Sequence, residues 1–438
     1  MLARKIAEYA CSLEYNHLNE EVVRELKRRV IDTIGVSFAA LDAQPVRIAR
    51  DYAAFSSSRY GATVFGSFMN SNLEDAVFVN GCAARYLDFN DTYLSREAIH
   101  PSDNIPAILA VAEAEGASGR EFLLGCAVAY EVACRLADAA SIRDRGWDHV
   151  TYIAISSAVG AAKVMALDVE KTVQAINLAA TPNVALRQTR AGELSMWKGC
   201  AAANAARNGV FAAVLAKLGM TGPSPIFEGE MGFFKQVSGE FDLNFVKGAP
   251  KVLETLIKRH PVEYHAMSAV DAALAVKQKI GESKIKSVTI DTFTVAWKII
   301  AKDPEKWAPK TKETADHSLP FIVCRALLDG FVWLDTFLDW KILDKEVEDL
   351  LSRTKVSVDP AFDSLYPQAT PNRVTVVTED GKSVSEEVVY PVGHYKNPMA
   401  DDVLEEKYLR LGGPKDALRT LWALDKRNVK EIIEAIRP

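Results

Sequence analysis

The 438-residue sequence lacks the common motifs of a cofactor site or a membrane segment. It has no CxxC pair among its six cysteines, no glycine-rich phosphate-binding loop, and no run of eighteen uncharged apolar residues. No block of five like charges occurs, and the formal net charge is -6. These absences argue against a nucleotide cofactor, a bilayer span and a nucleic-acid surface. We therefore expect a small-molecule substrate and no nucleic-acid or membrane partner.

The N-terminal segment and the cysteines favour a cytoplasmic protein. Residues 1–21 carry charges every few positions, so they lack the apolar centre of a secretory signal. The cysteines are scattered among small apolar residues in helical patterns. This setting is typical of buried thiols and not of disulfides or metal ligands.

Helical periodicity dominates the chain up to about residue 245. Asn19 is the predicted N-cap of the apolar-periodic stretch 20–41, and Ser118 with Glu121 forms an S-x-x-E capping box before the next long pattern. The Ala- and Gly-rich stretch 198–219 offers narrow helix faces that let backbones approach closely. The sequence therefore predicts an all-helical first domain over residues 1–245.

The pattern changes after residue 246. Residues 285–297 are rich in β-branched and aromatic residues, and Asp380-Gly381 separates two alternating runs, which is a strong hairpin signal. Because helical stretches at 265–280 and 319–334 share this region, 246–397 is predicted to be an α+β domain. Residues 398–438 are helical again and are expected to complete the first domain. The predicted fold class is thus mainly α with an inserted α+β lid domain.

Residues 88–100 form an unusually polar segment just before a helical pattern. Its polar side chains include Asp88, Asp91, Thr92, Arg96, Glu97 and His100 within thirteen residues. A solvated loop that caps the following helix is the ordinary interpretation. However, Pro101 fixes the backbone beside His100, and the N-terminal end of a helix attracts carboxylates. An active-site segment is therefore indicated, with a divalent-metal site on Asp88, Asp91 and His100 as the alternative.

Several histidines and lysines stand at the starts of other predicted elements. His149, His265 and His317 each precede a helical pattern, where capping or core roles are the alternatives to catalysis. Lys198 lies beside a small-residue helix, unless it is a surface lysine, and Lys258 lies in a basic turn before His260-Pro261. Cations gathered near histidines would suit a substrate with several carboxylates.

Long strings of this sequence resemble the MmgE/PrpD family. They are DFNDTYLSREAIHPSDNIPAILAVAEAEG, IKRHPVEYHAMSAVDAAL, ETADHSLPFIVCRALLDG and YPVGHYKNPMADDVLEEKY, and the resemblance extends from the first helix to the last. The family includes 2-methylcitrate dehydratases, cis-aconitate decarboxylases and iminodisuccinate epimerases. The resemblance implies a helical domain built from both ends of the chain, an α+β lid, a homodimer, and no required metal or other cofactor.

The resemblance also carries active-site positions onto this chain. They are Asp88, Thr92, His100, His149, Lys198, Lys258 and His265. Some family members have a tyrosine where this chain has Phe321, so that phenol is absent and the neighbouring His317 is a substitute candidate. We expect His100 and His149 to handle protons and Asp88 to hold a histidine tautomer. Thr92, Lys198, Lys258, His265 and His317 are expected to bind the substrate.

The reaction implied by the resemblance is the dehydration of 2-methylcitrate or a related hydroxy tricarboxylate. The string ETADHSLPF favours this branch of the family. Decarboxylation of cis-aconitate and epimerisation of iminodisuccinate are the alternatives, since all three reactions pass through carbanion-like chemistry beside a carboxylate. A catalytically silent binding or scaffold homologue is the non-enzymatic alternative. An aconitase-like iron–sulfur enzyme is disfavoured by the scattered thiols.

Overall fold

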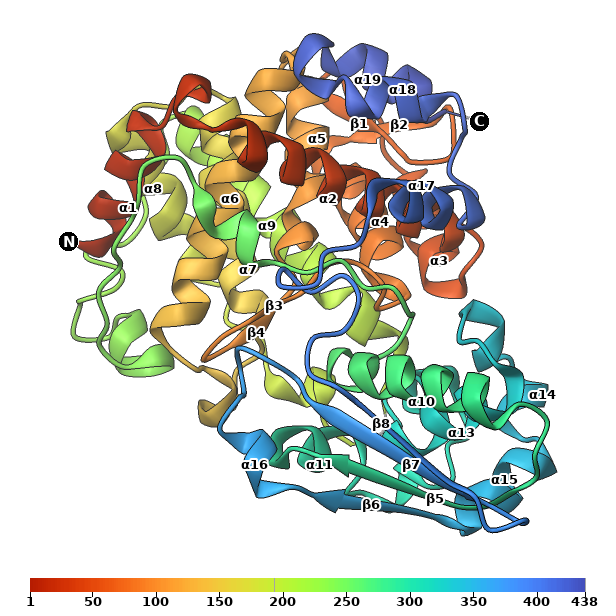
Figure 1. Cartoon of the computed structure of the whole chain (residues 1–438). Helices are drawn as coiled ribbons and strands as arrows, with labels where there is room; N and C mark the ends of the chain where they lie inside the picture. The colour runs from red at the N-terminus through yellow and green to blue at the C-terminus, as the bar shows by residue number, and fades with distance from the viewer. Residues whose placement is uncertain (193, 438) are drawn as a thin grey trace. The chain divides into compact units, whose positions relative to one another are not determined.

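The computed structural model describes residues 1–192 and 194–437, which form two compact units (Figure 1). Unit 1 contains Met1–Ile257 and the C-terminal segment from Ala400 onward, and unit 2 contains Lys258–Met399. The fold is mainly α with an α+β second domain, as the sequence predicted. The structure places the boundaries between the two units at residues 257/258 and 399/400.

Unit 1 is built chiefly from helices. They are α1 (Leu2–Ser12), α2 (Glu20–Ala39), α3 (Gln44–Ala53), α4 (Leu73–Tyr86), α5 (Ile105–Ala114), α6 (Gly119–Ala139), α7 (Val150–Val164), α8 (Val169–Ala180), α9 (Ala201–Lys217), α17 (Asp401–Arg410), α18 (Ala417–Trp422) and α19 (Val429–Ala435). Asn19 accepts a hydrogen bond from Val22 N at the start of α2, and Ser118 and Glu121 form the capping box of α6. Both predicted caps are confirmed.

Small residues allow the central helices of unit 1 to pack closely. A Cβ atom on Gly209 of α9 would lie 2.4 Å from the carbonyl oxygen of Ala154 in α7, and one on Gly160 would lie 2.9 Å from Ala129 Cβ in α6. Larger side chains would force these helices apart. At the C-terminal end of the chain, Lys407 of α17 contacts Asp32 of α2 at 2.6 Å, and both side chains are buried.

Two short hairpins interrupt the helical pattern of unit 1. Strands β1 (Gly61–Thr63) and β2 (Asn70–Asn72) pair with each other, as do β3 (Tyr93–Leu94) and β4 (Ala98–Ile99). The sequence did not predict them, because two or three residues are too few to display a period of two. The β3–β4 hairpin leads directly to His100.

Unit 2 contains a four-stranded sheet in the order β6-β5-β7-β8. Strand β5 (Ile285–Thr292) is parallel to β6 (Thr354–Val358) and antiparallel to β7 (Asn372–Thr378), which pairs with β8 (Ser383–Val388). Gly381, at φ +87°, lies in the turn between β7 and β8, so the predicted Asp-Gly hairpin is confirmed. The β-branched stretch 285–297 forms a strand up to Thr292, and Asp363 caps a helix that begins at Thr294.

Helices α10 (Met267–Ile280) and α13 (Leu319–Asp329) match the two helical stretches predicted in unit 2. The other helices are α11 (Thr294–Ile300), α12 (Lys312–Ala315), α14 (Asp339–Ile342), α15 (Lys345–Ser352) and α16 (Pro360–Asp363). Helix α10 packs on β7 and β8 (Figure 1). The segment just before α10 carries the predicted site residues of this unit.

None of the helices in the described residues combines the length and the apolar composition that crossing a bilayer requires. The six cysteines are free thiols, and all except Cys11 are buried, as predicted from their small apolar neighbours.

Candidate active site

The loop that follows α4 holds Asp88 in an uncommon backbone conformation. Asp88 has φ +52°, a region that aspartate enters more readily than most residues, and its side chain is buried. Asp91 fixes the same loop, because its Oδ1 accepts a hydrogen bond from Ser102 N (2.9 Å) and its Oδ2 accepts one from the Tyr130 hydroxyl (2.8 Å). Asp91 is therefore a structural anchor of the loop.

Asp88 lies between two cations. Arg85, in the last turn of α4, donates from Nη1 to Asp88 Oδ1 at 2.5 Å, and Lys198 Nζ lies 3.3 Å from Asp88 Oδ2. Lys198 is only 5% exposed, so the surface-lysine alternative is wrong. The Arg85 guanidinium also lies 3.9 Å from Asp103. The predicted residues Asp88 and Lys198, 110 positions apart in the chain, thus meet in one buried cluster.

Both ring nitrogens of His100 have partners. Nδ1 lies 2.7 Å from the backbone carbonyl oxygen of Asp91, which can only accept, so Nδ1 carries the proton. Nε2 then accepts from Arg85 Nη2 at 2.9 Å. The Thr92 hydroxyl lies 3.3 Å from Nδ1. The structure therefore brings Thr92 and His100 together and gives His100 a neutral, oriented ring.

His149 stands at the start of α7 with one ring nitrogen paired. Its Nδ1 lies 3.0 Å from Asp148 Oδ1, and Arg190 Nε donates to the same carboxylate oxygen at 3.1 Å. His149 is 5% exposed, and among the described residues no group hydrogen-bonds its Nε2. The ring centroids of His100 and His149 are 5.7 Å apart. The two predicted proton-handling residues are therefore neighbours.

Burial and the neighbouring charge of Arg190 together keep His149 neutral. Burial, assisted by Arg190, lowers the pKa of His149 to about 4, although Asp148 opposes the shift. Burial alone would raise the pKa of Asp148, but Arg190 and His149 outweigh it, so this pKa lies below its ordinary value. At neutral pH the Asp148 carboxylate is thus ionised, and Nε2 of His149 presents a lone pair.

Within unit 2, the predicted site residues gather around Glu263. Its Oε1 lies 2.7 Å from His265 Nδ1. Burial would raise the pKa of Glu263, but His265, His317 and Lys258 together outweigh it and lower the pKa to about 2. Lys258, His265 and His317 therefore share one electrostatic environment, with a permanent carboxylate at its centre.

Two further groups complete the cluster in unit 2. Asp316 Oδ1 lies 2.5 Å from His317 Nδ1, and the Asp316 carbonyl oxygen accepts from Glu263 N at 2.8 Å. On the other side, the Tyr366 hydroxyl lies 3.4 Å from His265 Nε2. Unlike His149, His265 thus has a partner at each ring nitrogen.

Comparison with known proteins identifies the relatives of this chain. Residues 4–246 match the MmgE/PrpD N-terminal domain, and residues 260–419 match the MmgE/PrpD C-terminal domain. The chain belongs to the MmgE/PrpD family. Cis-aconitate decarboxylase of Homo sapiens is 28% identical to this MmgE/PrpD protein, with 90% of this chain and 84% of the relative covered. The 2-methylcitrate dehydratase of Salmonella typhimurium is 31% identical over 76% of this chain and 74% of its own length, and that of Escherichia coli is 30% identical with the same coverage.

Phe321 of this MmgE/PrpD protein is the position for which His317 was the predicted substitute. The ring is fully buried, and its centroid lies 6.3 Å from that of Phe337. Phe321 is therefore a packing residue of α13. The Tyr366 hydroxyl, which the sequence did not single out, lies 3.4 Å from Nε2 of the predicted site residue His265.

Sequence reasoning missed the charged partners of the predicted histidines. They are Arg85, Asp148, Arg190, Glu263 and Asp316, and the neutral phenol of Tyr366 was missed as well. A basic residue in the last turn of a helix is common because it complements the helix dipole, so Arg85 gave no distinct signal. The strings 148-DH-149 and 263-EYH-265 do place a carboxylate beside a histidine, and this proximity was the available clue.

The alternative metal site is not assembled as a ligand set. Both carboxylate oxygens of Asp91 accept hydrogen bonds within the loop, and His100 Nδ1 faces a backbone carbonyl. Among residues 1–192 and 194–437, no group of three or more histidine, cysteine, aspartate or glutamate side chains is arranged to hold a metal ion.

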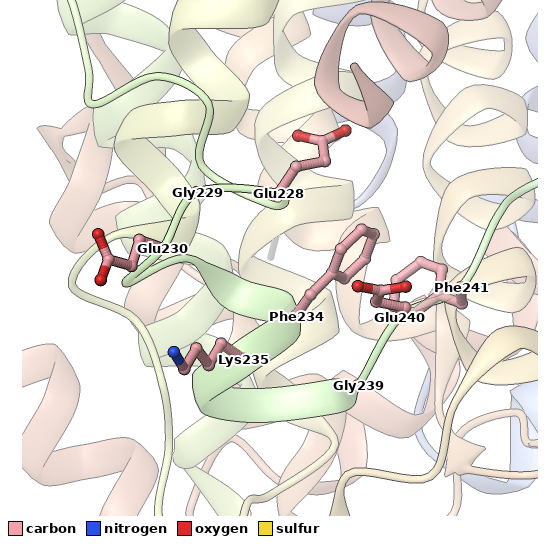
Figure 2. Close-up of a pocket in the computed structure, with 8 residues that line it drawn as sticks. All are labelled: Glu228, Gly229, Glu230, Phe234, Lys235, Gly239, Glu240 and Phe241. Carbon is pink, nitrogen blue, oxygen red and sulfur yellow. The ribbon is translucent and has the colours of Figure 1, made fainter.

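A separate surface pocket lies in the segment 228–241 (Figure 2). Its charged lining side chains are Glu228, Glu230, Glu240 and Lys235, with Phe234 and Phe241 beside them. Three carboxylates against one ammonium would repel an anionic substrate. None of the predicted site residues lines this pocket.

Proposed function

We propose that this protein is a cofactor-independent lyase that dehydrates 2-methylcitrate, or a related hydroxy tricarboxylate, by general acid–base elimination. The observation that carries the proposal is the buried Nε2 of His149, which lacks a hydrogen-bond partner among the described residues. Buried acceptors are rarely left unsatisfied, and those that are tend to mark functional sites. The Nη2 atom of Arg190 is a buried donor that also lacks a hydrogen-bond partner among the described residues.

The elimination needs a base and several cations. A base removes the proton from a carbon next to a carboxylate, the C–H electron pair becomes the new C=C bond, and the hydroxyl leaves as water after it gains a proton. Positioned acid–base groups supply about 10²–10⁴-fold of rate. Cations must support the remaining charge, and Arg85, Lys198 and Arg190 are the buried or nearly buried cations around the two histidines.

We assign the residue roles accordingly. His100 and His149 handle protons, and Asp88 orients Arg85 and Lys198 by its two carboxylate oxygens. Lys198 and Thr92 bind substrate carboxylates. Lys258, His265 and His317 are assigned to substrate binding because all three interact with Glu263 in one cluster.

Decarboxylation of cis-aconitate is the second candidate. The human relative named for this activity covers 90% of the chain, a larger share than the 2-methylcitrate dehydratases cover. Loss of CO₂ also leaves carbanion-like charge beside a carboxylate, so the same cations would support it.

One experiment separates these functions. Purified, chelator-treated protein is incubated in turn with 2-methylcitrate, citrate, cis-aconitate and iminodisuccinate, with and without added divalent metal. Water loss from 2-methylcitrate without metal is the expected result. Release of CO₂ from cis-aconitate, or epimerisation of iminodisuccinate, would select the corresponding alternative. A metal requirement would refute cofactor independence, and no turnover of any compound would favour a silent homologue.

We also propose that the protein is a homodimer. Light scattering during size-exclusion chromatography should give twice the mass of the chain, which is 48.1 kDa. A monomer at micromolar concentration would contradict this assignment.

A further inference from the structure

The two neighbouring histidines of unit 1 differ in what surrounds their rings. We infer that Asp148 and Arg190 are positioning residues that make Nε2 of His149 the base of the reaction, whereas His100 is held as a neutral ring by Arg85 and Asp91. This inference rests on the proposed lyase function and deepens it, because it decides which histidine removes the proton from carbon.

Asp148 fixes both the orientation and the tautomer of His149. The carboxylate is fully buried and can only accept, so the His149 nitrogen 3.0 Å away must carry its proton on Nδ1. The backbone holds Asp148 in place, because its N–H donates to the Ala185 carbonyl oxygen at 2.8 Å. The lone pair of the imidazole is thereby directed to Nε2, the atom without a hydrogen-bond partner among the described residues.

Arg190 keeps the Asp148 carboxylate ionised while it opposes a positive charge on the ring. It shares Asp148 Oδ1 with His149, at 3.1 Å and 3.0 Å respectively. The charged and titratable groups that face His149 are thus Asp148 and Arg190, together with Arg85 and His100 on the side of the polar loop. Asp148 favours the imidazolium, and Arg190 and Arg85 disfavour it. The ring is neutral before reaction and has a carboxylate ready to support the imidazolium after it.

His100 has the opposite arrangement. Its Nε2 lone pair accepts from the Arg85 guanidinium, and its Nδ1 proton is given to a carbonyl oxygen. To act as a base, Nε2 of His100 would first have to lose its hydrogen bond from Arg85, which also binds Asp88. In the proposed step, the carbon-bound proton therefore moves to His149 Nε2 and the C–H electron pair forms the C=C bond. The hydroxyl leaves with the C–O electron pair and takes a proton from solvent to become water. The imidazolium later loses its proton to solvent.

The negative charge of Asp148 is the first test. Asp148→Asn keeps the size of the side chain, and its amide oxygen at the position of Oδ1 can still accept from Arg190 and from Nδ1 of His149, so the tautomer is kept. The carboxylate that supports the imidazolium is lost. With 2-methylcitrate, kcat should therefore fall on the order of 10²-fold with KM nearly unchanged. Nitrogen NMR of ¹⁵N-histidine-labelled protein, with His149 assigned by His149→Gln, should show the proton still on Nδ1.

The pKa of His149 is the second test, because the two positioning residues push it in opposite directions. Asp148 raises this pKa and Arg190 lowers it. Asp148→Asn should therefore move it below the wild-type value of about 4, and Arg190→Gln should move it upward. A merely structural role of either residue would not produce opposite shifts in the same NMR titration.

Glu131→Gln is the matched control. Glu131 is a fully buried carboxylate of α6 that accepts from Arg135 and from Lys251 N, outside the cluster of the two histidines. This variant should keep the wild-type kcat and His149 titration. Wild-type kcat in Asp148→Asn, a wild-type ring that carries its proton on Nε2, or pKa shifts of the same sign in both variants would overturn the inference. If the wild-type protein turns over none of the test substrates, the proposed function fails instead, and the NMR result still decides the positioning roles.

Discussion

The two units contain similar histidine–carboxylate pairs with different surroundings. In unit 1, His149 Nδ1 lies 3.0 Å from Asp148, and in unit 2, His265 Nδ1 lies 2.7 Å from Glu263. Nε2 of His149 has no hydrogen-bond partner among the described residues, whereas Nε2 of His265 faces the Tyr366 hydroxyl. The histidine–carboxylate arrangement of unit 1 thus presents an unused Nε2 acceptor among the described residues, whereas that of unit 2 continues into a hydrogen bond with Tyr366.

The charged groups around the two histidine–carboxylate pairs also differ. His149 shares its carboxylate with Arg190, which helps burial to hold the ring neutral. The Glu263 carboxylate has His265, His317 and Lys258 around it, and His317 also contacts Asp316. The difference suggests that a histidine–carboxylate pair becomes a base only where a third, permanent cation competes for the carboxylate. The second unit is better suited to holding anionic groups of a substrate.

Apart from His149 itself, the largest effect that would test this contrast is expected at His100. His100→Ala removes the ring that Arg85 and the Asp91 carbonyl hold, and kcat for 2-methylcitrate should fall about 10²–10³-fold while the protein still folds. Steady-state kinetics and circular dichroism measure the two properties. Unchanged turnover would remove His100 from the mechanism and leave His149 as the sole imidazole required.

A smaller loss is expected at Lys198. Because its buried ammonium is assigned to a substrate carboxylate, Lys198→Ala should reduce kcat/KM about 100-fold, equivalent to about 3 kcal/mol of transition-state binding. Lys163→Ala is the control, since Lys163 is a partly buried lysine of α7 whose ammonium, among the described residues, donates to the Cys11 carbonyl oxygen. Wild-type kcat/KM in Lys198→Ala would refute the assignment.

The Tyr366 hydroxyl of unit 2 should contribute less to catalysis than His100 or Lys198. Tyr366→Phe removes the hydroxyl near His265 Nε2 and keeps the ring that stacks on Phe293, so kcat/KM should fall about tenfold or less. Phe321→Tyr should not restore it, because position 321 is enclosed by the core. A hundredfold loss in Tyr366→Phe would break the comparison by giving unit 2 a proton-transfer role.

The smallest effects are expected on stability in acid. The pKa of His149 is about 4 against an ordinary 6.5, so the unfolded chain binds more protons between these values and stability falls as pH drops from 6.5 to 4. For Glu263, the pKa falls from 4.5 to about 2, so stability is lost between pH 4.5 and 2. Each of these two pKa shifts contributes on the order of 3 kcal/mol at most to the free energy of unfolding.

Urea unfolding at a series of pH values would check both windows. His149→Gln should flatten the dependence between pH 6.5 and 4, and Glu263→Gln should flatten it between pH 4.5 and 2. If both variants flatten the same window, the two pairs do not differ in the way described.

Local signals in the sequence predicted the framework well. The caps at Asn19 and Ser118 and the turn at Gly381 depend on residues within three or four positions, so their physics is visible in the string itself. The short hairpin that leads to His100 was missed because its strands have only two residues each.

The individual site residues followed from the family resemblance, but their partners did not. Asp88 and Lys198 are 110 positions apart, and Arg190 lies 42 positions from Asp148. Such pairs exist only after the helices have packed, so no spacing rule relates them. The sequence could name two histidines, and only the geometry shows that their ring nitrogens are engaged differently.

The most direct test of the central assignment compares one histidine from each unit. The initial rate of unsaturated product formed from 2-methylcitrate is measured for the wild type, His149→Gln and His265→Gln under the same saturating conditions. We expect His149→Gln to lose on the order of 10²–10⁴-fold in kcat and His265→Gln to change chiefly KM. A His149→Gln protein that folds and retains wild-type kcat would contradict the assignment of the base to unit 1.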